Sequence, residues 1–329
     1  MIGPSSKARS QPGTLCAMTR VGILGAGGMG AAHARHWSAM PDVELHVYDP
    51  LQERAKALPA HAHASEGELR AAVDIVDVCL PTDLHREAAE EALNAGKAVF
   101  LEKPIARTLG DAEAISQMAE STGVPLGVGH VVRFFPDYAA AHRIIGDGGI
   151  GKPASARLRR GGGAPKGLDG WFMSSERSGG VLLDLAIHDF DWLLWTIGPV
   201  TEVLSRTVRR GGDGPDHALT LLKHENGCVS HVESTWMDPG GFRTEIDVAG
   251  SEGLVQYDSL REGVALRQSG TPVRTSRPDD PFYRELRSFL EAVRNDTPVP
   301  VSAKEAIAAL KVSLAAIESD RTGEKVILS

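Results

Sequence analysis

Arg20-Val-Gly-Ile-Leu-Gly25-Ala-Gly27-Gly28-Met29-Gly30 joins a short apolar segment to a glycine-rich turn, and residues 31–40 follow with helical composition. This is the G-x-G-x-x-G pattern, placed between a predicted strand and a predicted helix. Gly25 permits the tight turn, Gly27 lets the backbone approach a pyrophosphate, and Gly30 lets the helix pack closely on the sheet. The turn therefore predicts a dinucleotide site with contacts from Gly25, Gly27, Gly28, Met29 and Gly30.

An acidic residue follows at the expected distance. A second predicted strand, residues 43–48, ends at Asp49, which lies 19 positions after Gly30. A carboxylate at this place can accept hydrogen bonds from ribose hydroxyls and would repel a 2'-phosphate. We therefore expect NAD as the cofactor, with NADP less favoured. Arg54 is the nearest cation that would weaken this preference.

Strands and helices alternate as far as residue 129. Apolar strands are predicted at 73–80, 98–102 and 125–129, with helices between them at 84–95 and 109–121. Such alternation is typical of a parallel, doubly wound sheet, in which ligands bind beyond the carboxyl ends of the strands.

Two polar segments, Pro81-Thr82 and Glu102-Lys103, lie at these strand ends. Both are candidates for cofactor contact. Taken alone, Lys103 is more compatible with a solvated surface lysine.

Near residue 150 the pattern changes to strands without intervening helices. These are predicted at 154–160, 200–209, 218–223, 228–236, 243–248, 253–257 and 264–268, and helices at 281–294 and 303–321 close the chain. Alternating apolar positions indicate an antiparallel sheet. The glycine-rich residues 161–170 are expected to form a flexible loop that shapes or covers a pocket.

The expected fold is α/β. An N-terminal Rossmann domain with a doubly wound parallel sheet would precede a C-terminal α+β domain with a large, mostly antiparallel open sheet. We place a disordered leader at residues 1–17, the dinucleotide-binding domain at 18–130, and the substrate-binding and oligomerisation domain at 131–329.

Polar side chains interrupt the otherwise almost entirely apolar stretch 179–198. Asp184 and His188 are four residues apart, which would place both on one face of a buried helix, and Asp191 extends the stripe. A buried acid and imidazole are costly unless they are paired or used in chemistry. The pair therefore indicates either a reaction site or a satisfied core pair, whereas Asp191 is more compatible with a structural role.

Composition excludes several classes of protein. The 329 residues carry a formal charge of -8 and no dense run of Lys and Arg, which argues against a nucleic-acid partner. The sequence contains no run of 18 apolar residues, which a membrane span would need, so we expect no membrane partner. The three cysteines are widely spaced and form no CxxC pair, so we expect a reducing cytoplasm and no metal site.

The chain resembles the glucose-fructose oxidoreductase, inositol dehydrogenase and rhizopine-catabolism (Gfo/Idh/MocA) family of NAD(P)-dependent sugar and polyol dehydrogenases. The resemblance runs from about Thr19 to Leu328. It rests on the glycine turn, Pro81-Thr82 with His85, Glu102-Lys103-Pro104, Arg133-Phe134, Trp171-Phe172, and Gly179-Gly180 through Asp184 and His188.

The resemblance implies roles for particular residues. The catalytic residues would be Lys103, Asp184 and His188. The cofactor would be bound by the glycines and Asp49 together with Pro81, Thr82, His85, Glu102 and Lys103. The substrate would contact this catalytic trio and also His130, Arg133 and Trp171. His130 departs from the family, because it stands where the common Gly-Phe-Asn-x-Arg-Phe pattern has a polar amide. A ligand contact and a satisfied strand-end histidine both stay open for His130. Trp171 could likewise be a core residue instead of a ligand contact.

The expected reaction is hydride transfer between a secondary alcohol of a sugar or polyol and nicotinamide, with His188 as the base, because imidazole titrates at about 6.5. Two rival functions are a non-catalytic NAD-binding regulator and a glycoside hydrolase that retains and recycles NAD. Since helices of the chain can cover only one face of the second sheet, we also expect a homodimer or homotetramer formed through the other face.

Overall fold

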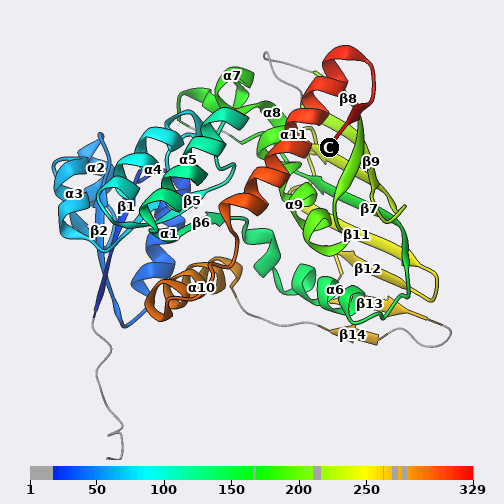
Figure 1. Ribbon diagram of the computed structural model, residues 1–329, viewed down its shortest axis with the longest axis horizontal. Helices are drawn as coiled ribbons and strands as arrows, with labels where there is room; N and C mark the ends of the chain where they lie inside the picture. Colours follow the sequence, from blue (N-terminus) through cyan, green and yellow to red (C-terminus); the bar gives the residue numbers. More distant parts are fainter. Residues whose placement is uncertain are drawn as a thin grey trace, which may run out of the picture.

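Two sheets side by side dominate the molecule (Figure 1). The computed structural model describes residues 18–165, 168–209, 216–261, 263–268, 273–275 and 280–328. The expected leader, residues 1–17, lies outside this range, as do residues 166 and 167 of the expected loop. Among the described residues, no helix is long and apolar enough to cross a membrane.

The first sheet is parallel and six-stranded, with the order β3-β2-β1-β4-β5-β6. Its strands are β1 (Thr19–Leu24), β2 (Val43–Tyr48), β3 (His61–Ala62), β4 (Ile75–Val78), β5 (Ala98–Glu102) and β6 (Leu126–Gly129). Its helices are α1 (Gly28–Ser38), α2 (Gln52–Lys56), α3 (Glu66–Ala72), α4 (His85–Asn94) and α5 (Leu109–Thr122). The predicted doubly wound parallel sheet is confirmed, and only the short α2, β3 and α3 were not predicted.

The second sheet has nine strands in the order β14-β13-β12-β11-β7-β10-β9-β8-β15. They are β7 (Pro153–Gly161), β8 (Val200–Val208), β9 (His217–His224), β10 (Val229–Thr235), β11 (Arg243–Gly250), β12 (Leu254–Asp258), β13 (Val264–Arg267), β14 (Val273–Thr275) and β15 (Val326–Ile327). All neighbouring pairs are antiparallel except β7 and β10, which pair in parallel. The predicted mostly antiparallel sheet is therefore confirmed.

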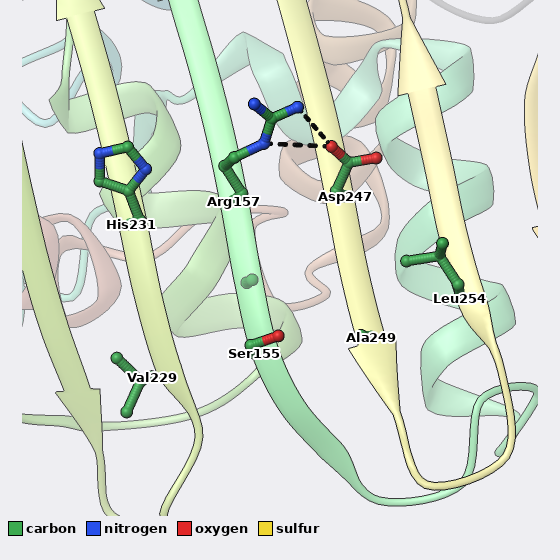
Figure 2. Close-up of a pocket in the computed structure, with 8 residues that line it drawn as sticks. Ser155, Arg157, Val229, His231, Asp247, Ala249 and Leu254 are labelled. Atoms are coloured by element: carbon green, nitrogen blue, oxygen red, sulfur yellow. Dashed lines mark hydrogen bonds and ion pairs between the residues drawn. The ribbon is translucent and has the colours of Figure 1, made fainter.

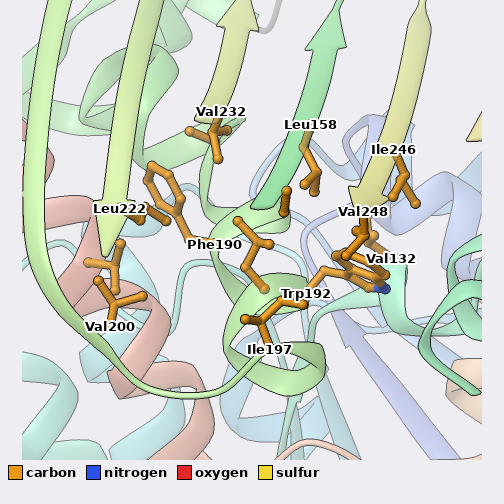
Figure 3. Packing of buried hydrophobic residues seen from close by; sticks show 14 of the residues in the cluster. Val132, Leu158, Phe190, Trp192, Ile197, Val200, Leu222, Val232, Ile246 and Val248 are labelled. Carbon is orange, nitrogen blue, oxygen red and sulfur yellow. The ribbon is translucent and has the colours of Figure 1, made fainter. Parts of the chain in front are cut away.

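Helices cover one face of this second sheet (Figure 1). They are α6 (Pro136–Gly146), α8 (Gly180–Asp184), α9 (Ile187–Thr196) and α11 (Ala303–Thr322), while α7 (Ser175–Ser178) lies beside α8. Phe190 and Trp192 of α9 are fully buried against strand residues such as Leu158 and Val232 (Figure 3). Burying an aromatic side chain of this kind contributes about 1.5–3 kcal/mol, so α9 is fixed firmly on the sheet.

The last two long helices connect the two halves. Helix α10 (Pro281–Asn295) returns to the parallel sheet, where Leu286, Phe289 and Leu290 join a core that contains Trp37 of α1. Helix α11 contributes Ala309 to the core of the parallel sheet and other residues to that of the second sheet. The division between residues 130 and 131 stays a prediction, because this packing ties the C-terminal segment to both sheets.

The first residues of the expected loop, 161–163, take part in strand pairing. Gly161 ends β7, Gly163 forms a bridge with Met237, and a 3-10 turn spans Leu168–Met173.

Candidate active site

The glycine turn between β1 and α1 has the geometry that its pattern predicts. Gly25 has φ +95°, and a Cβ added there would lie 2.7 Å from the Cys79 carbonyl oxygen. A Cβ on Gly30 would lie 1.9 Å from the Gly25 carbonyl oxygen, whereas one on Gly27 or Gly28 would meet no heavy atom within 4 Å. Gly25 and Gly30 are therefore required by the fold, and Gly27 and Gly28 leave open space at the helix N-terminus. This arrangement suits the pyrophosphate of a dinucleotide.

Asp49 supports this turn from the end of β2. Its Oδ2 accepts a hydrogen bond from the Ala26 N–H and its Oδ1 from the Leu51 N–H, both at 2.8 Å, and the residue is buried. The carboxylate thus fixes the backbone of the turn. Each carboxylate oxygen can accept a further hydrogen bond, so the ribose contact stays a prediction.

His85 links the two polar segments that lie at the ends of β4 and β5. Its Nδ1 lies 2.8 Å from the Pro104 carbonyl oxygen and its Nε2 lies 3.0 Å from the Leu80 carbonyl oxygen. His85 and Thr82 are both buried, while Met29 of the glycine turn is exposed. His85 therefore holds the Pro81 and Lys103 segments together, and its contact with the cofactor stays a prediction.

The stretch with Asp184 and His188 is not the single helix that its spacing predicts. Helix α8 ends at Asp184 and α9 begins at Ile187. The Leu185 and Ala186 N–H groups both bond to the Val181 carbonyl oxygen. In a continuous helix the His188 N–H would bond to the Asp184 carbonyl, but it bonds to that of Leu185 instead. The prediction of a single helix was therefore wrong, because the hydrogen-bond pattern is interrupted at Leu185 and Ala186, although both residues keep right-handed helical dihedral angles.

This break frees the Asp184 carbonyl for Lys103. The Lys103 Nζ donates to the Asp184 carbonyl oxygen and to the Asp184 Oδ1, both at 2.8 Å. The two side chains are each 15% exposed. A lysine at the end of β5 thus meets an aspartate of the second half of the chain, 81 positions later, in a site that stays accessible to a ligand.

His188 lies beside this ion pair in the form that a base requires. Burial, followed by the positive charges of Lys103 and Arg160, lowers the pKa of His188 well below its ordinary value. Its Nδ1 is buried and has no hydrogen-bond partner among the described residues. The imidazole is therefore neutral at physiological pH and able to accept a proton.

Asp191 lies one turn beyond His188 and is held by Arg133. The Arg133 Nε and Nη2 donate to the Asp191 Oδ2 and Oδ1 at 2.8 and 2.6 Å, and the Arg133 Nη1 donates to the Glu305 Oε1 at 2.6 Å. This guanidinium is thus committed to two carboxylates, which leaves its predicted substrate contact without structural support. The geometry suits a structural role for Asp191.

His130 lies next to that ion pair. Its Nδ1 is 3.7 Å from the Asp191 Oδ2, and neither ring nitrogen has a hydrogen-bond partner among the described residues. Burial and the nearby Arg133 and Lys103 oppose its charge, and the pKa of His130 is lowered even though Asp191 acts in the other direction. The alternative of a strand-end histidine without a ligand role stays open. Its contact with the substrate stays a prediction.

Trp171 lies in the 3-10 turn that follows β7 and stacks on Phe172 with a centroid distance of 4.0 Å. The segment after this turn is tied to the parallel-sheet half, because the Arg107 guanidinium donates to the Ser175 and Glu176 carbonyl oxygens. Trp171 is partly buried, which is compatible both with a core residue and with a ligand contact. Its substrate contact therefore also stays a prediction.

Sequence reasoning missed a second buried ion pair beneath α9. The Arg160 Nε and Nη2 donate to the Asp189 Oδ2 and Oδ1 at 3.0 and 2.8 Å, and both residues are almost fully buried. Asp189 directly follows His188, so this pair fixes the start of α9. The only sequence signal was an acid within an apolar helix, which gives no indication of its partner.

Comparison with known proteins identifies the family. Residues 19–130 match the model of an oxidoreductase family with an NAD-binding Rossmann fold, and residues 138–256 match that of the GFO/IDH/MocA C-terminal domain. The scyllo-inositol 2-dehydrogenase (NAD(+)) of Bacillus subtilis (strain 168) is 31% identical over 333 residues, covering 94% of this chain and 96% of the relative. The chain belongs to the GFO/IDH/MocA oxidoreductase family. The predicted resemblance is confirmed.

Two further similar proteins support this assignment. The myo-inositol 2-dehydrogenase of Thermotoga maritima is 28% identical and covers 91% of this chain and 96% of its own length. The crystal structure of GenD2 from gentamicin A biosynthesis, in complex with NAD, superposes with a TM-score of 0.86 at 25% identity, covering 98% of this chain and all of that one. The protein is an NAD-binding oxidoreductase, which makes the purely regulatory alternative less well supported.

A surface hollow on the second sheet lies away from this site (Figure 2). It is lined by Ser155, Arg157, Val229, His231, Asp247, Ala249 and Leu254. Successive side chains of a strand point to opposite faces, and the neighbours Leu158 and Val248 are buried with α9. The hollow therefore lies on the face opposite to α9 and His188, and it is not the active site of an oxidoreductase.

Proposed function

We propose that the protein is an NAD-dependent dehydrogenase that acts on a secondary alcohol of a cyclic polyol, a sugar or a sugar derivative. Relatives named as inositol 2-dehydrogenases cover more than nine-tenths of the chain at 28 to 31% identity and support this substrate class. The observation that carries the proposal is the meeting of Lys103 and Asp184, whose Nζ and Oδ1 are 2.8 Å apart, beside the neutral His188.

His188 would act as the acid and base of the reaction. In the oxidative direction its imidazole takes the hydroxyl proton of the substrate, and the carbonyl forms as hydride leaves the same carbon. Bound NAD would supply the hydride acceptor at its nicotinamide ring. In the reductive direction His188 returns the proton to the developing alkoxide.

Lys103 and Asp184 would orient the alcohol and stabilise charge on its oxygen. The ammonium of Lys103 places a cation where alkoxide character develops, and such stabilisation is a large contribution to catalysis in a partly dehydrated site. Asp184 holds that ammonium through two oxygens and can accept a hydrogen bond from a neighbouring substrate hydroxyl. A polyol with adjacent hydroxyl groups suits this arrangement.

The test is a panel of inositols, sugars and sugar derivatives assayed by NADH absorbance with purified protein. We expect steady NADH release with at least one polyol. Lys103→Ala should lower turnover by about 100-fold or more, whereas Asp184→Asn should raise the Michaelis constant with a smaller loss of turnover. Cleavage of a glycoside without release of NADH would instead favour the NAD-retaining hydrolase. Binding of NAD without any turnover would favour a regulator.

The cofactor should be NAD in preference to NADP. The buried Asp49 keeps a carboxylate at the end of β2, where it opposes a 2'-phosphate. Comparison of the two dissociation constants tests this, and Asp49→Ser should narrow the preference. NADP binding as tight as that of NAD would contradict it.

The protein should form a homodimer or homotetramer through the uncovered face of the second sheet. Leu204, Leu219, Leu221 and Val229 are each at least 36% exposed on neighbouring strands of that face. The ion pair between Arg157 and Asp247, which lies beside the hollow, continues the same face (Figure 2). An exposed apolar patch of this kind is typical of an isologous interface. Light scattering that gives the monomer mass of 35.0 kDa would count against it.

We further place the protein in the cytoplasm. Cys79 and Cys228 are free thiols, as suits a reducing compartment, and NAD is an intracellular cofactor.

A further inference from the structure

A buried polar cluster lies behind the glycine turn, outside the site described above. His33 of α1 and Asp77 of β4 are both fully buried, and the His33 Nδ1 lies 2.9 Å from the Asp77 Oδ2. On its other side the His33 Nε2 lies 3.2 Å from the Oε1 of Glu102, which is 6% exposed, and this contact is an ion pair by distance and not a hydrogen bond. One imidazole thus bridges two carboxylates in the interior of the parallel-sheet half.

The surroundings of His33 favour its protonated form. Burial by itself opposes the charge, but the Asp77 carboxylate, at hydrogen-bond distance from the His33 Nδ1, raises the pKa of His33 above its ordinary value. A buried charge is tolerated only when it is paired, and a carboxylate on each side meets this condition. Glu285 of α10 also faces the cluster, and burial with the nearby Glu102 raises its pKa well above the ordinary value, so it is protonated and neutral.

Glu102 connects this cluster to the active site. Its Oε2 accepts a hydrogen bond from the Lys103 N–H at 3.1 Å. A Cβ added to Gly129 of the adjacent β6 would lie 3.1 Å from the Glu102 Oε1, so the glycine at this position leaves room for the carboxylate. The His33 ion pair therefore determines where the Glu102 carboxylate lies, and that carboxylate holds the backbone of Lys103.

We propose that His33 is a positioning residue for Lys103: its imidazolium joins Asp77 to Glu102 and so connects the dinucleotide-binding helix α1 to the lysine of the active site. This proposal rests on the proposed role of Lys103 in catalysis. Helix α1 would then bind the cofactor at its N-terminus and hold Lys103 through the buried ion pair. One rigid element would thus position both the cofactor and the lysine that contacts the substrate. Misplacement of a reacting group by about 1 Å can cost about 100-fold in rate.

A metal ion is the main alternative for this cluster. The ligand atoms of His33, Asp77 and Cys79 lie within 4.8 Å of one another. The observed contacts favour hydrogen bonding instead, because the Trp37 Nε1 donates to the same Asp77 Oδ2 at 2.7 Å and burial raises the pKa of the Cys79 thiol. A protonated thiol is a poor metal ligand.

The experiment compares His33→Gln with Trp37→Phe in the full-length protein. His33→Gln removes the charge between Asp77 and Glu102, whereas Trp37→Phe removes a different donor to Asp77 and leaves the contact between His33 and Glu102. Turnover and the Michaelis constant are measured on the best polyol substrate, and the dissociation constant of NAD is measured by titration. The rate at which an amine reagent modifies Lys103 is followed by mass spectrometry, which needs no substrate.

We expect His33→Gln to lower turnover by about tenfold or more, to speed modification of Lys103, and to change NAD affinity by less than about twofold. Trp37→Phe should lower the unfolding midpoint with turnover and Lys103 modification unchanged. If His33→Gln does not fold, Asp77→Asn removes the charge that keeps His33 protonated and is scored by the same measurements.

Unchanged turnover and unchanged Lys103 modification in a folded His33→Gln protein would overturn the proposal, as would equal effects in both variants. Stoichiometric zinc in the purified wild type that is lost in His33→Gln would also overturn it in favour of a metal site. If no polyol is oxidised by the wild type, the proposed function fails, but Lys103 modification still decides the role of His33.

Discussion

Replacement of Asp191 by Asn separates a structural role from a catalytic one. Asp191 lies one turn beyond His188, and its carboxylate receives two hydrogen bonds from Arg133, at 2.8 and 2.6 Å. The two side chains are 1% and 6% exposed. Asp191→Asn keeps the size of the side chain and removes the charge that this arginine requires.

The expected loss of stability follows from this burial. Removing one partner of a buried ion pair costs about 3–5 kcal/mol, because the other charge stays buried without its counter-ion. Arg133 would keep its contact with Glu305, and the Asn oxygen can still accept one hydrogen bond, so we expect the lower end, about 3 kcal/mol. Since about 1.4 kcal/mol corresponds to a factor of ten, the equilibrium constant of unfolding should rise more than about a hundredfold.

Urea unfolding followed by tryptophan fluorescence measures this change, with turnover of the folded protein measured in parallel. The matched control is Glu305→Gln, because the Glu305 side chain is 42% exposed and its pairing with the same arginine should contribute less than about 1 kcal/mol. A folded Asp191→Asn protein with wild-type stability and a large loss of turnover would refute the structural role and make Asp191 part of the catalytic machinery.

Three further predictions concern the base, the glycine turn and the uncovered sheet face. Because burial and the neighbouring cations lower the pKa of His188, the rate of alcohol oxidation should stay at its plateau at pH 6.5 and fall only at lower pH. His188→Ala should lose about 100-fold or more in turnover and should not show this acid limb of the pH profile. An acid limb centred above neutrality in the wild type would contradict this prediction. Gly30→Ala should destabilise the apo protein by about 1–3 kcal/mol, since its Cβ would meet the Gly25 carbonyl oxygen, while Gly28→Ala should leave stability unchanged and weaken NAD binding in titrations. Leu221→Arg, on the uncovered face, should shift the protein toward monomers in light scattering with turnover per folded chain retained; an unchanged mass would exclude this patch as the interface.

The ordinary pKa of an imidazole is not sufficient to predict the pH dependence of this protein. Sequence reasoning assigned His188 an imidazole pKa of about 6.5, which leads to an acid limb near neutrality. The structure places Lys103 and Arg160 close to this imidazole in a buried site, and both lower its pKa. These cations come from β5 and β7, so their effect depends on contacts that no local pattern contains.

The stretch around Asp184 and His188 illustrates a similar limit. The spacing of polar residues predicted one helix that carries both residues, but the structure divides the stretch into α8 and α9. The assignment of both residues to one reaction site stays a prediction. The His188 N–H bonds to the Leu185 carbonyl, and the Asp184 carbonyl accepts a hydrogen bond from the Lys103 Nζ instead. Helical periodicity contains no information about a contact between residues 81 positions apart.

The sequence by itself determined the features that depend on neighbouring residues. The glycine turn, the alternating strands and helices of the parallel sheet, and the period-two strands of the second sheet follow from backbone freedom and from the side on which apolar residues recur. Only the tertiary structure decided which polar groups meet: Arg133 with Asp191, Arg160 with Asp189, and His33 with Asp77 and Glu102. The physical reason is that a buried charge is tolerated only beside an opposite charge. Which opposite charge lies beside it depends on how the two sheets and the helices between them pack.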